Sequence, residues 1–182
     1  MTSRLYQLSS VPTEKNVADE KFYSHFYVKR LSAEPLLDAI DQVTQVRTKY
    51  KSLPLGTRAI ELPDGEYPDY FLTVFGKPRR ASVCECERMP DENLAQALHT
   101  LNGEILAKKL GDKVGRVAML AKEEMDEAEA INRLYLTALS RPPRDEELKV
   151  LQGFREEIDT EQAFYEDVLW MLINSKEFLF NH

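Results

Sequence analysis

The second half of the sequence carries the strongest structural pattern, a series of apolar stripes at helical spacing. Within each stripe the apolar residues recur every three or four positions, and helix-ending pairs such as Asn102-Gly103 and Pro142-Pro143 separate the stripes. A helix with one apolar side must bury that side against a neighbour. Residues 89–182 are therefore predicted to form a helical part. The stripes are Leu94/Leu98/Leu101, Ile105/Leu106/Leu110, Ile131/Leu134/Leu139, Leu148/Leu151/Phe154 and Phe164/Val168/Leu172.

Capping residues and breakers indicate where several helices begin and end. Ser32 precedes an apolar stripe that starts at Leu36, and Thr160 precedes the stripe of Phe164, so both are predicted N-caps. Arg141-Pro142-Pro143 should end one helix, and Asn174-Ser175 should start a short final turn. Trp170, Phe178 and Phe180 are predicted to pack between helices, because they follow the same periodicity.

Residues 23–88 are patterned as a mixture of helix and strand. Arg58–Leu62 and Arg80–Cys86 alternate in the manner of short strands, the second more cleanly than the first. The sequence therefore predicts a small two- or three-stranded β element around residues 57–86. Such a short element is not stable alone and would have to pack on the helices.

The first 22 residues are polar and weakly patterned, and we expect them to form an arm that lies against something else. The whole chain, residues 1–182, is predicted to be a single domain, since 182 residues can bury about 70% of the surface that the unfolded chain exposes. The predicted fold class is mainly α, an irregular helical bundle with the small β element.

Composition excludes several classes of protein. The net charge is −7 and the sequence pI is about 5.1, which argues against a nucleic-acid-binding module. No apolar run approaches the roughly 20 residues of a membrane span, so direct membrane insertion is not expected. A disulfide scaffold is excluded as well, because the chain has two cysteines with one residue between them.

Cys84, Cys86 and His99 form the most specific candidate site. In an extended segment Cys84 and Cys86 point the same way, and their Cα atoms lie about 6.5–7 Å apart, which favours two thiols over a disulfide. If the next helix folds back, His99 would approach them. Thiolates and imidazoles are the ligands that zinc prefers, so a metal site of these three residues is one interpretation.

Two observations weaken the metal interpretation. A structural zinc usually has four ligands, and His25 or His182 would have to supply the fourth. Paired zinc-binding cysteines also favour two intervening residues. In the other interpretation, which we favour, the thiols pack as small apolar groups and His99 bonds to the backbone. No haem-attachment motif and no recognisable nucleophile site is present, so no cofactor and no catalytic residue is predicted.

Several stretches, in order along nearly the whole chain, carry a family resemblance: Tyr6–Ser10, Arg30–Glu34, Leu37–Ile40, Leu55–Ala59, Phe75–Arg80, Cys84–Arg88, Asn93–His99, Leu101–Gly103, Leu134–Pro143 and Asn174–His182. Together they resemble one known family, the planctomycete-specific C-terminal domain of unknown function. The departures are Met89-Pro90, where a Ser-rich linker is more usual, and the strongly acidic residues 123–129.

The resemblance implies a fragment of a longer, exported protein located in the periplasm or at the cell surface. In that family the domain ends large secreted proteins that also carry planctomycete-type cytochrome-c-like and helical domains. The expected partners are those other domains, and no activity can be carried over. The strong helical periodicity, the polar arm and the absence of a polar catalytic constellation in the sequence lead us to expect a non-catalytic scaffold or docking domain. The alternative is a metal- or redox-linked domain centred on Cys84, Cys86 and His99.

Overall fold

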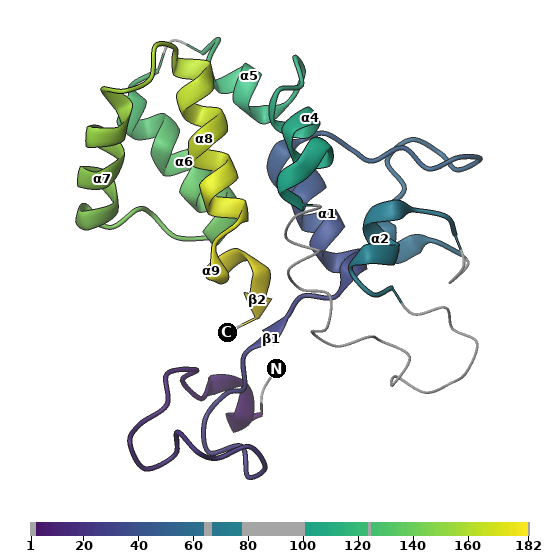
Figure 1. Cartoon of the computed structure of the whole chain (residues 1–182), viewed down its shortest axis with the longest axis vertical. Coiled ribbons are helices and arrows are strands. Elements are labelled where there is room, and N and C mark those ends of the chain that lie inside the picture. Colours follow the sequence, from purple (N-terminus) through teal and green to yellow (C-terminus); the bar gives the residue numbers. More distant parts are fainter. Residues whose placement is uncertain (1–2, 64–66, 78–100, 124, 182) are drawn as a thin grey trace.

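The computed structural model describes residues 3–63, 67–77, 101–123 and 125–181. Figure 1 shows a helical body with an N-terminal segment that projects from it. The first half contains η1 (Arg4–Gln7), β1 (Lys29–Arg30), α1 (Ala33–Thr44), η2 (Ala59–Glu61) and α2 (Tyr70–Val74). The second half contains η4 (Leu101–Ile105), α4 (Leu106–Leu110), α5 (Arg116–Leu120), α6 (Glu127–Leu139), α7 (Asp145–Arg155), α8 (Glu161–Ile173), α9 (Lys176–Leu179) and β2 (Phe180–Asn181).

α8 lies at the centre of the second half. It packs against α4, α5, α6 and α9, and Figure 1 shows it between α6 on one side and α4 and α5 on the other. Phe164, Val168 and Leu172 are buried, as the stripe predicts. Trp170 is 42% exposed, so its predicted packing between helices is wrong, whereas Phe178 is buried and Phe180 packs against the core.

The predicted helix boundaries are confirmed where capping residues set them. Ser32 is the N-cap residue of α1, and Thr160 caps α8 by accepting a hydrogen bond from Ala163 N at 3.2 Å. The Ser175 hydroxyl accepts from Phe178 N at 3.2 Å and starts α9. α6 ends before Ser140, which has a left-handed backbone conformation with φ of 57°, and the two prolines that follow cannot continue a helix.

α1 links the two halves and carries polar as well as apolar buried side chains. Leu36, Leu37, Ile40 and Val43 are buried as predicted. Arg116, in α5, donates from Nε to Val43 O at 2.6 Å and so satisfies a carbonyl at the C-terminal end of α1.

The Asp38 carboxylate of α1 explains why the prediction of a strand over Arg58–Leu62 is wrong. It accepts hydrogen bonds from Ala59 N at 2.6 Å and Ile60 N at 3.4 Å, and these amides begin the 3-10 helix η2. The second predicted strand, Arg80–Cys86, lies outside the described residues.

The β element that the structure describes joins the segment before α1 to the segment after α9. β1 and β2 pair antiparallel, with Lys29 opposite Asn181 and Arg30 opposite Phe180, and Leu31 N donates to Leu179 O at 2.9 Å. The predicted fold class, mainly helical with a small two-stranded sheet, is confirmed, but this sheet lies away from residues 57–86.

Candidate functional site

The three residues of the sequence-predicted site, Cys84, Cys86 and His99, lie outside the described residues, and a metal site there stays a prediction. In the part of the chain that the structure describes, no cluster of three His, Cys, Asp or Glu side chains could hold a metal ion. The His25 ring lies edge-on to Tyr27 at 4.9 Å. None of the described helices combines the length and the apolar character that crossing a bilayer requires.

Residues 3–28 form the projecting segment, which is longer than the predicted arm of the first 22 residues and is called the arm from here on. Hydrogen bonds within the arm hold its shape. The Asp19 carboxylate accepts from the backbone amides of Phe22 at 2.8 Å and Ser24 at 2.9 Å. The hydrogen bond from the Ser24 hydroxyl and those from the backbone hold the pKa of Asp19 well below its usual range. The Asn16 amide donates to Ser24 O at 3.2 Å and ties the two sides of this turn together.

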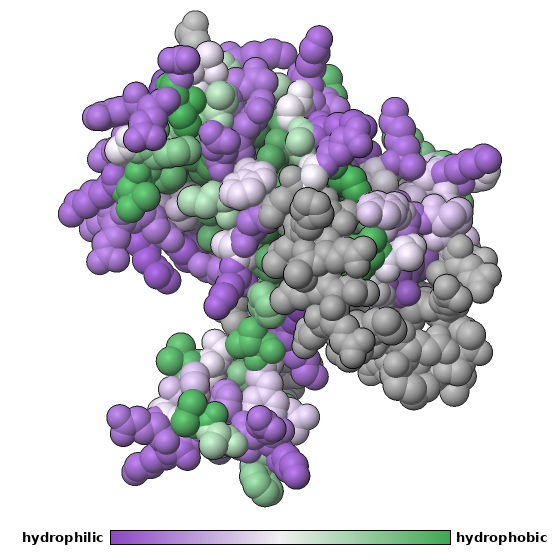
Figure 2. Space-filling view, viewed as in Figure 1, coloured by the Kyte–Doolittle hydropathy of each residue, from purple (hydrophilic) through white to green (hydrophobic). Residues whose placement is uncertain are grey.

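The arm has ring contacts but no core of its own. Tyr23 stacks on Tyr27 at 4.8 Å, and Tyr6 lies 6.4 Å from Phe26. No described residue of the arm is buried, and Phe22 is 87% exposed. Figure 2 shows apolar side chains among hydrophilic ones on the surface of the arm, which is the lower part of that view. The large exposed apolar residues of the arm are Tyr6, Leu8, Val11, Val17, Phe22, Tyr23 and Val28.

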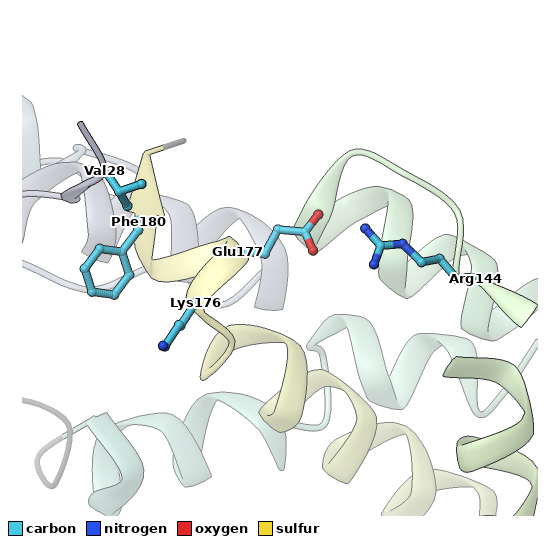
Figure 3. Close-up of a pocket in the computed structure, with 5 residues that line it drawn as sticks. All are labelled: Val28, Arg144, Lys176, Glu177 and Phe180. Carbon is cyan, nitrogen blue, oxygen red and sulfur yellow. The ribbon is translucent and has the colours of Figure 1, made fainter. Parts of the chain in front are cut away.

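A cleft of about 580 Å³ lies where the arm meets the helical body. Figure 3 shows that its lining comes from segments far apart in the sequence. The residues that line it are Val28, Arg144, Lys176, Glu177 and Phe180. Val28 precedes β1 and Phe180 begins β2, so the pairing of the two strands places these apolar side chains at one end of the cleft.

The charged side of the cleft is fixed by the starts of two helices. Arg144 is the N-cap residue of α7, and its backbone N donates to the Glu147 carboxylate at 2.7 Å. Lys176 and Glu177 begin α9, whose first turn is capped by Ser175. These backbone contacts hold the Cα atoms of the charged residues in defined places and leave the side chains of Arg144 and Lys176 exposed.

Arg141 binds both acidic groups beside the cleft. Its guanidinium donates to both oxygens of Glu147, at 2.8 Å each, and to both oxygens of Glu177, at 2.7 and 2.8 Å. The guanidinium also lies 5.6 Å from the centre of the Tyr135 ring. The hydrogen bonds from Arg141 lower the pKa of Glu147 from 4.5 to about 2 and raise that of Arg141.

Two cations of the cleft remain without such a partner. Arg144 and Lys176 form no ion pair with any residue that the structure describes. The cleft therefore has apolar Val28 and Phe180 at one end and two exposed cations, Lys176 and Arg144, on either side of Glu177. This arrangement is suited to a ligand that carries both anionic and apolar groups. The five lining residues include no serine, cysteine or histidine that could act as a nucleophile.

Sequence reasoning missed this cleft, although two of the stretches that carry the family resemblance reach it. Leu134–Pro143 contains Arg141 and ends next to Arg144, and Asn174–His182 contains the three lining residues of α9 and β2. Nothing in either stretch indicates that they meet.

The comparisons with known proteins give one match. The family model of PSD1, described as a protein of unknown function (DUF1553), matches residues 1–155, which end with the last residue of α7. No curated protein and no solved structure matches the sequence. Because the match covers well over half of the chain, the protein belongs to the PSD1 family of proteins of unknown function.

Proposed function

We propose that this protein is a non-catalytic docking domain of an exported multidomain protein, and that the arm is the part that docks. The observation that carries the proposal is the arm itself. It projects from the body, has no buried residue, and presents aromatic and branched apolar side chains to solvent.

The hydrogen bonds of the arm support this function, because they stay within it. In the described part of the chain, the side-chain hydrogen bonds and ring contacts of residues 3–28 join one arm residue to another. The arm thus has defined turns without support from the helical body. A surface that is ordered before binding loses less conformational entropy on binding, which favours affinity.

The energetics of the exposed side chains point the same way. Full burial of one large apolar side chain contributes about 1.5–3 kcal/mol, and the isolated chain gains only a small part of this from Phe22 or Val11. Apolar groups gathered on one projecting segment are a feature of surfaces that bind other proteins. The sequence resemblance supplies the proposed partners, the other domains of the exported protein.

The proposal is tested by binding in trans. The remaining part of the natural polypeptide is expressed separately, and its affinity for residues 1–182 is measured by calorimetry. Phe22→Ser combined with Val11→Ser should weaken binding at least about tenfold, because truncation of a hot-spot aromatic residue in an interface costs about 2 kcal/mol or more and a tenfold loss corresponds to about 1.4 kcal/mol. The thermal unfolding midpoint should stay unchanged, since both side chains are exposed.

The matched control removes exposed apolar groups from the helical body. Leu55 and Val114 are each 75% exposed and lie outside the arm. Leu55→Ser combined with Val114→Ser should leave the affinity unchanged. Equal affinities for the arm variant, the control variant and the unaltered chain would overturn the proposal.

A further inference from the structure

We infer that the cleft at the base of the arm binds an acidic peptide segment of the docked domain, with an apolar side chain on Val28 and Phe180 and its acidic groups attracted by Lys176 and Arg144, which lie on either side of Glu177. The inference rests on the proposed docking function, because Val28 is both the last residue of the arm and a lining residue of the cleft. The inference specifies which chemical groups the partner segment of that function carries.

Charge determines the anionic half of the ligand. Arg144 and Lys176 have no ion-pair partner among the described residues. Glu177 also lines the cleft, but both of its carboxylate oxygens accept hydrogen bonds from Arg141. Its repulsion of an incoming carboxylate is thereby reduced, and the two exposed cations set the local sign.

The apolar end determines the other half of the ligand. Val28 is 47% exposed, and Phe180 lies beside it in Figure 3, away from Arg144. A volume of about 580 Å³ is enough for the side chains of a short peptide segment and falls within the usual range of ligand sites. An inorganic anion would leave the apolar end uncovered.

Two other occupants fit the structure less well. Nucleic acid needs many phosphate contacts, and the chain offers two cations here on a protein of net charge −7. Three acidic residues of the chain's own segment 123–129 are already paired. Glu123 and Glu129 form ion pairs with Arg133 at 3.0 and 3.1 Å, and Glu127 pairs with Arg155 at 2.9 Å. A carboxylate from another domain would not have to leave one of these pairs.

The support behind the cleft makes it a defined site. Arg141 ties α7 to α9 through Glu147 and Glu177, so the two helix starts that carry Arg144 and Lys176 are held at a fixed spacing. An Arg that bonds two carboxylates through paired N–H groups is a rigid connection. The backbone at Arg144 and Lys176 therefore does not have to move when a ligand binds.

The test uses a peptide probe and the full chain. An acetylated and amidated Gly-Phe-Asp-Gly tetrapeptide is titrated into residues 1–182, and backbone amide shifts are followed by NMR. The amides of Val28, Arg144 and Lys176 should shift together. The same peptide with Asn in place of Asp should bind at least about fivefold more weakly, because the charge attraction to the two cations is lost. Added salt should weaken only the Asp peptide.

Variants assign the effect to the cleft. Arg144→Gln combined with Lys176→Gln should remove the difference between the two peptides. Lys149→Gln, which removes an exposed lysine of α7 outside the cleft, should retain it. Equal binding of both peptides to the unaltered chain, or shifts confined to other regions, would overturn the inference.

The same variants separate this inference from the proposed function. In the binding experiment in trans, the double cleft variant should weaken affinity about fivefold or more on top of the effect of the arm variant. If the arm variant weakens docking and the cleft variant does not, the inference fails and the docking function stands. If neither variant changes the affinity, the docking function fails.

Discussion

Lys108 and Lys109 are neighbours on α4, but we expect the stability of the fold to depend on Lys109 and not on Lys108. Lys109 is 9% exposed and donates to Asp41 Oδ1 at 2.7 Å, Val46 O at 2.8 Å and Thr48 Oγ1 at 3.0 Å. Lys109→Gln should lower the free energy of unfolding by about 3–5 kcal/mol, because the Asp41 carboxylate stays buried without its cation. Urea unfolding measures the effect.

The control is the adjacent residue. Lys108 is 71% exposed and pairs with Glu104 across solvent. Lys108→Gln should leave the urea midpoint unchanged. Equal losses of stability for the two variants would contradict the placement of Lys109.

Glu147 makes the free energy of unfolding depend on pH. Hydrogen bonds from Arg141 lower its pKa in the folded chain from 4.5 to about 2, so the charged carboxylate stabilises the fold. That contribution is complete above about pH 4.5 and is lost as the pH falls toward about 2. Glu147→Gln should therefore flatten the plot of unfolding free energy against pH in this window, measured by urea unfolding.

Glu146 provides the comparison for that experiment. It is exposed and adjacent, and Glu146→Gln leaves the Arg141 pair intact. The pH dependence between about pH 4.5 and 2 should persist in this variant. Parallel curves for the Glu147→Gln variant and the unaltered chain would show that the pair does not stabilise the fold.

No local pattern could have predicted the pairs of Asp41 with Lys109 and of Arg141 with Glu177. Asp41 and Lys109 lie 68 positions apart, and Arg141 and Glu177 lie 36 apart. A charged residue inside an apolar stripe looks the same in sequence whether it is paired in the core or solvated. The family resemblance includes Arg141 but does not say what it contacts.

At the scale of the element, the start of α8 is set by a side-chain cap. Thr160 Oγ1 accepts from Ala163 N, and Thr160→Ala should lower the free energy of unfolding by about 0.5–2 kcal/mol because an amide of the first turn loses its acceptor. Thermal unfolding checks the change. Thr137→Ala serves as control, since the Thr137 hydroxyl bonds Arg133 O inside α6.

Alanine at position 137 should leave stability equal or slightly higher, because a helix-interior threonine has a lower helix propensity than alanine. If the two threonine variants lose the same stability, the loss at Thr160 is not a capping effect.

Helices whose ends are set by nearby residues could be predicted from the sequence. Elements that depend on contacts with residues far away in the chain could not. Apolar spacing and caps predicted α1, α6, α8 and α9 with boundaries close to those found. Arg58–Leu62 has the alternation of a strand, but its amides bond to Asp38, about twenty positions earlier. β1 and β2 have two residues each, which is too short for alternation to be visible.

At the scale of the whole molecule, the candidate site is assembled from three distant segments. The end of the arm, the start of α7 and the segment from α9 to β2 meet at the cleft. The residue pattern indicated a polar arm, and the sequence as a whole indicated a docking role. Neither indicated which surface the arm and the helical body share. Cys84, Cys86 and His99 stay a prediction, because they lie outside the described residues.

Hydrogen exchange of the arm amides tests the docking function most directly. The exchange of residues 3–28 is compared between residues 1–182 alone and the longer polypeptide that the proposed docking function requires. In the longer polypeptide the amides around Val11, Val17 and Phe22 should exchange at least about tenfold more slowly, and those around Leu55 should not change. Identical exchange of the arm in the two proteins would contradict the account.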